Sequence, residues 1–255
     1  MLHIRDFFGF FYAACLQFLV AGILLSFIAY AKKSVKPLIA AGLLFIFFSF
    51  DSIALHIPFL LSFNHFRWNF EGKFIEVLWP LILVYIFGFL NPKMIGIKWP
   101  KHKNDLLLGV ELGILIALCN IVISIVWFKD SILPQSAPVE TILFQFTMPG
   151  LGEEIVFRGF LLALLNQYIG FQRNIFNLYS GWGIIIVSFL FILIHTINYL
   201  PTQQAIVWNG DVLTICSLVI TSFVLGYLRY KTDSIWPCVL AHNFINGVYF
   251  MVVAF

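Results

Sequence analysis

Long apolar segments recur along the whole chain, and they limit its fold more than any other feature of the sequence. A membrane-spanning helix needs about 20 predominantly apolar residues, within a range of about 17–25. Proline, glycine and charged residues divide the chain into eight such segments. They are residues 7–30, 37–63, 74–90, 106–128, 139–168, 181–200, 211–230 and 236–254. The pattern predicts an all-α fold, a polytopic membrane protein with about eight transmembrane helices.

The composition agrees with a membrane location. Hydrophobic residues make up 61% of the 255 positions and charged residues 11%. Ordinary soluble domains contain about 45–50% apolar and about 25% charged residues. Because a soluble protein covers its surface with charge, these values exclude a soluble enzyme, a nucleic-acid-binding protein and a disordered chain. The net charge of +3 is too small to indicate an acidic partner.

Positive charge in the short loops predicts the orientation in the membrane, since cytoplasmic loops carry an excess of Lys and Arg. Ten such residues, Arg229 among them, follow the odd-numbered segments, and four, Lys73 among them, lie on the other side. This asymmetry favours both termini outside the cytoplasm. The first apolar run, residues 7–30, is longer than the apolar region of a signal peptide, so we interpret it as the first span.

Most ionisable residues within these segments stand alone. Asp51, His56, Glu76 and Glu111 lie in or near the ends of the second, third and fourth segments. A charged side chain in the middle of a spanning helix costs about 2.5–3.5 kcal/mol on insertion scales. Helix ends and polar contacts between helices account for these four residues, so we favour a structural role over a chemical one.

The fifth segment differs, because it contains two carboxylates and a guanidinium within six consecutive residues. Glu154 and Arg158 are four residues apart, so they share one face of an α-helix and can form an ion pair. Glu153 points about 100° away around the helix, toward another neighbour. Adjacent buried carboxylates also repel each other, which favours a proton on one of them. The pattern is typical of a general base in a water-filled pocket, and a purely structural ion-pair network is the alternative.

Two further segments carry groups with matching chemistry. His195 ends an apolar run one turn after Phe191, and His242 and Asn246 lie four residues apart on one face of the last segment. A single histidine on an apolar helix is more often a buried core residue. Here three helices each contribute such groups to a chain with few polar residues. We therefore predict a hydrolytic site with a base, its partner and donors for an oxyanion.

These residues resemble the three ordered motifs of the CAAX protease and bacteriocin-processing (CPBP, or Abi) family of intramembrane proteases, which includes the type II CAAX prenyl endopeptidases. The motifs are Glu153-Glu154-x-x-x-Arg158, Phe191-x-x-x-His195 and His242-x-x-x-Asn246. The resemblance covers about residues 138–250, where it implies a catalytic core. Residues 1–130 are expected to form N-terminal transmembrane helices of unassigned role, within a single membrane domain of residues 1–255.

The resemblance implies an intramembrane endopeptidase and a role for each residue. Glu153 would activate the attacking water, with His195 as its partner. His242 and Asn246 would bind the developing oxyanion. Such a glutamic-type site hydrolyses a peptide bond without a covalent intermediate.

The resemblance leaves open whether a metal takes part, since Glu153, His195 and His242 are plausible zinc ligands. The sequence contains no HExxH motif. The resemblance implies that Glu154 and Arg158 support the site. The guanidinium group of Arg158 would then disfavour a second cation, such as a zinc ion, beside it. We therefore expect no cofactor, with Zn²⁺ as the alternative.

The expected partners are a peptide or protein substrate that enters from the membrane, and the lipid bilayer itself, with no nucleic acid. The resemblance suggests peptide or leader processing, CAAX-like processing or bacteriocin self-immunity. A short chain with few loops and no organellar signal favours a multi-pass protein of a prokaryotic cell membrane. The sequence gives no indication of the oligomeric state.

Two other classes of function remain open at this point. One is a non-catalytic immunity or scaffold protein of the membrane that retains the motifs for its structure. The other is a proton-coupled transporter that uses Glu153 and Glu154. A transporter would predict inverted repeats in the two halves, and the sequence shows no such symmetry.

Overall fold

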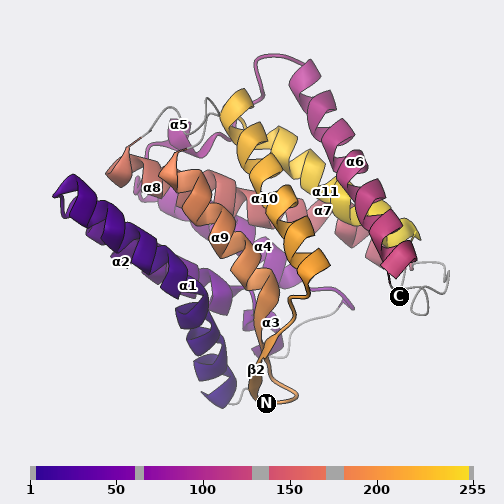
Figure 1. Cartoon of the computed structure of the whole chain (residues 1–255), viewed down its shortest axis with the longest axis horizontal. Helices are drawn as coiled ribbons and strands as arrows, with labels where there is room; N and C mark the ends of the chain where they lie inside the picture. Colours follow the sequence, from indigo (N-terminus) through magenta and orange to yellow (C-terminus); the bar gives the residue numbers. More distant parts are fainter. Residues whose placement is uncertain (1–3, 61–65, 128–137, 171–180, 253–255) are drawn as a thin grey trace. The chain divides into compact units, whose positions relative to one another are not determined.

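The computed structural model of the chain describes residues 4–60, 66–127, 138–170 and 181–252, and helices dominate these residues (Figure 1). The α-helices are α1 (Ile4–Lys32), α2 (Lys36–Ala54), α3 (Ile57–Leu60), α4 (Phe70–Leu81), α5 (Pro92–Ile95), α6 (Asn104–Trp127), α7 (Val139–Glu154), α8 (Leu162–Ile169), α9 (Trp182–Thr196), α10 (Val212–Thr232) and α11 (Trp236–Val252). Two π-helices are η1 (Ile82–Ile86) and η2 (Ile155–Leu161), and a hairpin is formed by β1 (Ile197–Leu200) and β2 (Ala205–Trp208). The predicted all-α class is confirmed, with one small hairpin added.

Each predicted helix coincides with an observed helical segment, and the differences lie at ends and breaks. The predicted helix 37–63 is divided, because α2 ends at Ala54 and the short α3 follows. The predicted helix 74–90 begins earlier, at Phe70, and changes to the π-helix η1 soon after Pro80. Proline has no N–H to donate and its ring crowds the preceding turn. The predicted positions 61–63, 128 and 253–254 lie outside the described residues.

Some of these helices are long enough to span a membrane. Among the described residues, four helices are long and apolar enough to cross a membrane, namely α1, α2, α6 and α10. The helix α9 is also apolar but has 15 residues. The other predicted spans are shorter or interrupted by π-helical turns.

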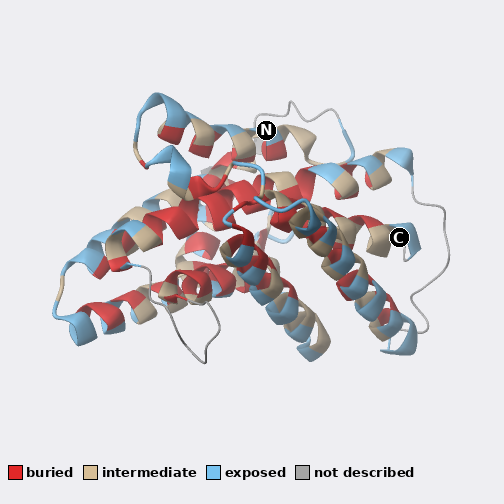
Figure 2. Cartoon of the chain, turned by 90° about the horizontal axis from the view of Figure 1, so that it is seen from above, coloured by how far each residue is buried: buried red, intermediate tan, exposed pale blue. Residues whose placement is uncertain are grey.

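The long helices expose large apolar side chains. Figure 2 shows buried and exposed residues on opposite faces of single helices. Ile23 of α1, Leu115 of α6 and Ile220 of α10 are each more than half exposed, at 61%, 56% and 55%. Apolar surface on this scale is unfavourable in water and matches the hydrocarbon of a bilayer. The exposed faces therefore point to an integral membrane protein.

The chain divides into two compact units, and each combines an early with a late segment. Unit 1 contains Met1–Asn64 and Phe160–Phe223, and unit 2 contains His65–Gly159 and Val224–Phe255. The border between the units therefore falls within η2 and again within α10.

Unit 1 contains the hairpin that the sequence did not predict. The predicted helix 181–200 ends as α9 at Thr196, and Ile197 begins β1, which pairs antiparallel with β2. Contacts with α1 hold the hairpin. Gln17 donates to the carbonyl of Ile197 at 2.6 Å, and the Tyr199 hydroxyl donates to Asp6 at 3.0 Å. These bonds satisfy buried polar groups at the point where α9 stops.

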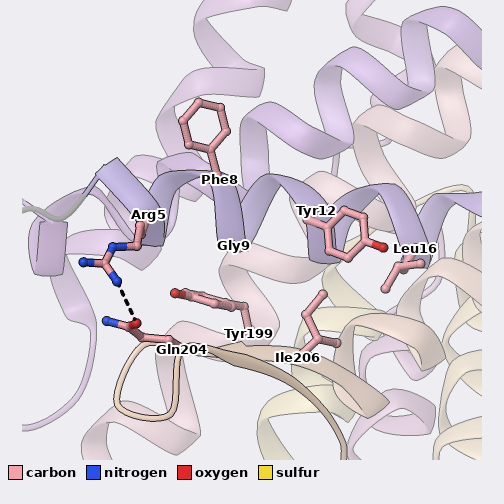
Figure 3. Close-up of a pocket in the computed structure, with 8 residues that line it drawn as sticks. All are labelled: Arg5, Phe8, Gly9, Tyr12, Leu16, Tyr199, Gln204 and Ile206. Atoms are coloured by element: carbon pink, nitrogen blue, oxygen red, sulfur yellow. Dashed lines mark hydrogen bonds between the residues drawn. The ribbon is translucent and has the colours of Figure 1, made fainter.

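A pocket of about 500 Å³ lies between α1 and this hairpin within unit 1 (Figure 3). Its walls are largely aromatic and aliphatic, with Tyr12 and Tyr199 among them. At one end Arg5 donates to the side-chain oxygen of Gln204 at 3.2 Å. None of the predicted site residues lines this pocket.

In unit 2, α6 and α11 pack with their backbones in close contact. Gly109 and Gly113 of α6 are four residues apart and face α11. A Cβ atom at Gly113 would lie 2.5 Å from the carbonyl oxygen of Ala241, and one at Gly109 would meet the carbonyl oxygen of Pro237. Small residues at this spacing allow membrane helices to approach each other closely. This packing holds α11 in place at Ala241, the residue before His242.

Gly113→Ala should therefore destabilise unit 2, because the added methyl group meets backbone that cannot rotate away. We expect the free energy of unfolding to fall by about 1–3 kcal/mol, the usual cost of overpacking. Thermal unfolding of the purified protein in detergent measures this change. The matched control is Gly42→Ala in α2, where a Cβ would meet nothing within 4 Å. An equal loss of stability in both variants would contradict the role assigned to Gly113.

Candidate active site

The helix that carries Glu153 and Glu154 changes its winding immediately after them. The α-helix α7 ends at Glu154, the π-helix η2 runs from Ile155 to Leu161, and α8 follows directly. Together they occupy the predicted helix 139–168. A π-helical turn widens the helix and is frequent at functional sites. The sequence interpretation assumed regular α-helical geometry here and did not predict this turn.

Glu154 is at the centre of the buried contacts in unit 2. Its Oε1 atom accepts from Arg158 Nη1 at 3.1 Å and from His242 Nδ1 at 2.8 Å. All three residues are buried, with 0%, 1% and 3% of their surface exposed. The ion pair predicted for Glu154 and Arg158 is thus present, and His242 joins it from α11.

The contact with Glu154 determines which nitrogen of the His242 ring carries a proton. A carboxylate only accepts hydrogen bonds, so we assign a proton to Nδ1 of His242. The other ring nitrogen, Nε2, lies 3.9 Å from Oε2 of Glu153. Glu154 therefore orients the imidazole so that its second nitrogen faces the neighbouring carboxylate.

Glu153 has a cationic partner that the sequence interpretation missed. Its Oε1 atom accepts from Lys73 Nζ at 2.8 Å, and the same ammonium group lies 2.8 Å from Oε2 of Glu76. Lys73 and Glu76 are both on α4 and both buried. Two earlier interpretations are corrected here. Lys73 is not a loop residue, and Glu76 is not a helix-end residue.

The signal for this pair was present in the sequence. Lys73 and Glu76 are three residues apart in a mostly apolar helix, which is a spacing at which opposite charges meet. Because Lys73 was counted as a loop cation in predicting the membrane orientation, this ion pair was not recognised.

Contacts between α4 and α7 hold these charges in place. Asn69 caps α4 by accepting from the Gly72 N–H at 3.0 Å. Trp68, just before the helix, donates from its indole to Thr141 at 2.9 Å and from its backbone to Glu140 at 3.0 Å. The start of α4 is therefore fixed to the start of α7, and both helices then lead to the charged cluster.

Asn243 joins α11 to α7 beside the cluster. Its Oδ1 atom accepts from the Gly150 N–H at 2.8 Å, and its Nδ2 atom donates to the Thr147 carbonyl at 3.1 Å. Pro149 lies between these two positions inside α7 and has no N–H of its own. Asn243 is not one of the predicted site residues, and its two hydrogen bonds give it a structural role next to His242.

The remaining predicted residues occupy different environments. Asn246 is half-buried on α11, one turn after His242, and makes no hydrogen bond among the described residues. His195 belongs to unit 1 and is half-buried at the end of α9. Its Nδ1 atom lies 2.8 Å from the Phe191 carbonyl, so we assign a proton to that nitrogen. The structure thus brings together Glu153, Glu154, Arg158 and His242 in unit 2, while His195 is described within unit 1.

The turn that leads into α11 is fixed by Arg229, which had been counted as a loop residue. It is buried in the last turn of α10 and donates to the carbonyls of Arg158 at 3.1 Å and Met94 at 2.8 Å. Asp233 follows in the left-handed conformation, with φ of 51°. Burial would raise the pKa of Asp233, but hydrogen bonds from Lys98 and Arg229 hold it below its ordinary value.

The charges of unit 2 bear on the zinc alternative. Within the described residues, no group of three or more His, Cys, Asp and Glu side chains is arranged to hold a metal ion. The carboxylates of Glu153 and Glu154 already contact Lys73 and Arg158. A divalent cation at these carboxylates would lie beside the ammonium group of Lys73 and the guanidinium group of Arg158.

The fold and this cluster together define a class of protein, a helical membrane protein that buries carboxylates and a histidine among apolar helices. Residues 135–248 match the family model described as type II CAAX prenyl endopeptidase Rce1-like. The predicted resemblance is thereby confirmed. No curated protein and no solved structure matches the chain. All six predicted site residues lie within the matched region, whereas Lys73 and Glu76 lie before it.

Asn243→Leu should destabilise the contact between α7 and α11, because it removes one buried and one partly buried hydrogen bond to the α7 backbone. We expect the free energy of unfolding to fall by about 1–3 kcal/mol for each buried group left without its bond. Unfolding in detergent by a denaturant titration measures this loss. Asn246→Leu is the matched control on the same helix, and its stability should remain close to that of the wild type. The structural role of Asn243 is refuted if the two variants are equally stable.

Proposed function

We propose that the protein is an intramembrane endopeptidase that hydrolyses a peptide bond with a water molecule activated by Glu153. The observation that supports this most directly is the 3.9 Å between Glu153 Oε2 and His242 Nε2. Two atoms at this separation can each lie about 2.7–3.0 Å from a single reacting oxygen. A base and a ring nitrogen therefore face one reaction centre, inside a buried cluster.

The proposed reaction begins with proton transfer from water to Glu153. The water oxygen forms a bond with the carbonyl carbon of the substrate, and the carbonyl oxygen becomes an oxyanion. The C–N bond then breaks, and the proton held by Glu153 passes to the leaving nitrogen. The products are a carboxylic acid and an amine, which exchange a proton to give a carboxylate and an ammonium group, with no covalent link to the protein. The family resemblance assigns His195 as the partner of Glu153, and we keep that role in the proposal.

His242 and Asn246 are the proposed donors to the oxyanion. Since Nδ1–H of His242 is bonded to Glu154, donation from Nε2 requires the imidazolium form of the ring. The Asn246 amide, one turn away on α11, would supply the second donor. Preorganised donors of this kind stabilise developing charge without reorganisation during the reaction. Glu154 and Arg158 support the site by fixing the His242 ring.

We propose that this chemistry needs no metal, and the positions of Lys73 and Arg158 support the proposal. Both cations lie at the carboxylates that would have to bind zinc. The ammonium and guanidinium groups supply the positive charge that a metal would otherwise bring to the site.

The substrate class follows from the family match. We propose a peptide or a protein segment that enters from the membrane, processed at a CAAX-like C-terminus or as a leader or bacteriocin peptide. We also propose that the shorter helices, α7, α9 and α11 among them, lie within the bilayer, which gives a multi-pass protein with about eight spans. A prokaryotic cell membrane is the proposed location.

Glu153→Gln should slow cleavage strongly, because the amide cannot accept a proton from water. We expect kcat to fall by about 10²–10⁴-fold, the range for a lost general base. The measurement uses purified protein in liposomes with two probes, a farnesylated CAAX-type peptide and the same peptide without its lipid. A chelator should leave the wild-type rate unchanged. Full cleavage by Glu153→Gln would refute the proposed mechanism, and chelator-sensitive cleavage that zinc restores would establish the metal alternative.

Asn246→Ala should lower kcat by about 10²–10³-fold with little change in KM, as expected for the loss of an oxyanion donor. The same liposome assay measures both constants. Thermal unfolding of the variant should match the wild type, because Asn246 makes no hydrogen bond among the described residues. A variant that cleaves normally would remove Asn246 from the proposed oxyanion site.

A further inference from the structure

We infer that Lys73 and Glu76 of α4 set the charge and the position of Glu153, so that Lys73 is a positioning residue of the active site. The inference rests on the proposed role of Glu153 as the base. It also gives a function to part of the N-terminal half of the chain, since both residues precede the region that matches the family. The resemblance to the family assigns neither residue a role.

The geometry makes Lys73 a shared cation. Its ammonium group lies 2.8 Å from a carboxylate oxygen of Glu153 and 2.8 Å from one of Glu76. The contact with Glu153 joins α4 to α7, whereas Glu76 lies one turn further along the same helix as Lys73. One oxygen of Glu153 is thus held by Lys73, and the other is the oxygen that faces His242.

Burial makes this contact strong. The side chains of Lys73, Glu76 and Glu153 expose 9%, 2% and 11% of their surface. Buried charges are weakly screened, and removing one partner leaves the other uncompensated. A lysine in an apolar helix is therefore retained here only with carboxylates beside it.

Gly152 allows the two helices to come this close. A Cβ atom at this position would meet Oε2 of Glu76 and would lie 3.1 Å from Cδ of Lys73. The glycine that precedes Glu153 is therefore the surface against which the Lys73–Glu76 pair packs. Any larger residue there would push the ammonium group away from the proposed base.

The charged groups of unit 2 around Glu153 define the expected effect. Among the described residues they include Lys73 and Glu76 from α4, Glu154 from its own helix, Arg158 from η2 and His242 from α11. Lys73 favours the ionised form of Glu153, which is the form that accepts a proton from water. Glu76 opposes this by placing a second negative charge 2.8 Å from the same ammonium group.

Removing the two partners should therefore change the pH dependence in opposite directions. Activity falls on the acid side when the base becomes protonated. Lys73→Met should move this acid limb of kcat/KM to higher pH by about 1–3 units, the range for loss of an adjacent opposite charge. Glu76→Gln should move it to lower pH by up to about one unit, since a nearby like charge is removed. A merely structural ion pair would lower the rate in both variants without opposite shifts.

The experiment measures pH–rate profiles of the full-length protein in liposomes with the farnesylated and unmodified peptides. Lys73→Arg retains the positive charge and should return the acid limb toward that of the wild type. Lys98→Met is the matched control, because Lys98 pairs with Asp233 at the surface of the same unit, with 47% and 61% of the two side chains exposed. Its profile should coincide with the wild type.

An infrared titration gives a second readout that does not need cleavage. The carbonyl band of protonated Glu153, identified by its loss in Glu153→Gln, is followed as a function of pH in each variant. Its midpoint should move in the same directions as the acid limb. If the wild type cleaves neither peptide, the infrared titration alone tests the inference.

The outcomes separate the inference from the proposed function. Opposite shifts in Lys73→Met and Glu76→Gln, with Lys98→Met unchanged, support the role of Lys73. Identical profiles, or equal shifts in one direction, overturn it while leaving the base in place. Cleavage that persists in Glu153→Gln overturns the proposed function, and the infrared midpoints then still report whether Lys73 controls the charge of Glu153.

Discussion

The structure of unit 2 depends on one buried carboxylate, that of Glu154. A single oxygen of this group accepts from Arg158 and from His242. Without these donors a fully buried carboxylate would be far too costly to retain. The same two bonds tie the end of α7 to η2 and to α11, and Arg229 extends the connection to α10 through the Arg158 carbonyl. Glu154 thus holds α7, η2 and α11 together, and it thereby orients the imidazole of His242 beside Glu153.

Close approach of the helices is the second requirement, and glycine provides it at each contact. Lipid tails are as apolar as leucine, so helices in a membrane associate through tight packing and hydrogen bonds. Gly113 brings α6 against α11, and Gly152 brings α4 against α7. At Gly150 a Cβ atom would lie 2.6 Å from Oδ1 of Asn243 and 2.7 Å from the carbonyl of Val239. The polar cluster therefore lies beside glycines, where a neighbouring backbone or side chain packs directly against a helix backbone.

The sequence predicted the helices and the ion pair of Glu154 with Arg158, because apolar length and a four-residue spacing are local properties. It did not predict the contacts that depend on which helices meet. The contact of Lys73 with Glu153 could be recognised only with α4 placed against α7. Asn243 and Asn246 could not be distinguished from their spacing alone, since the difference lies in the backbone of α7 that Asn243 reaches. The hairpin after Thr196 was missed because an apolar run of this length reads equally well as the end of a helix.

The position of α4 in the chain has a consequence for modularity. The region that matches the family begins at residue 135, yet the cation at Glu153 comes from residue 73 and the glycine face that supports α11 comes from α6. A segment cut at the limits of the family match would contain Glu153 without its counter-ion, Lys73. The part of the chain that matches the family is therefore smaller than the part that holds the cluster together, and transplanting the matched region alone would separate Glu153 from the lysine that contacts it.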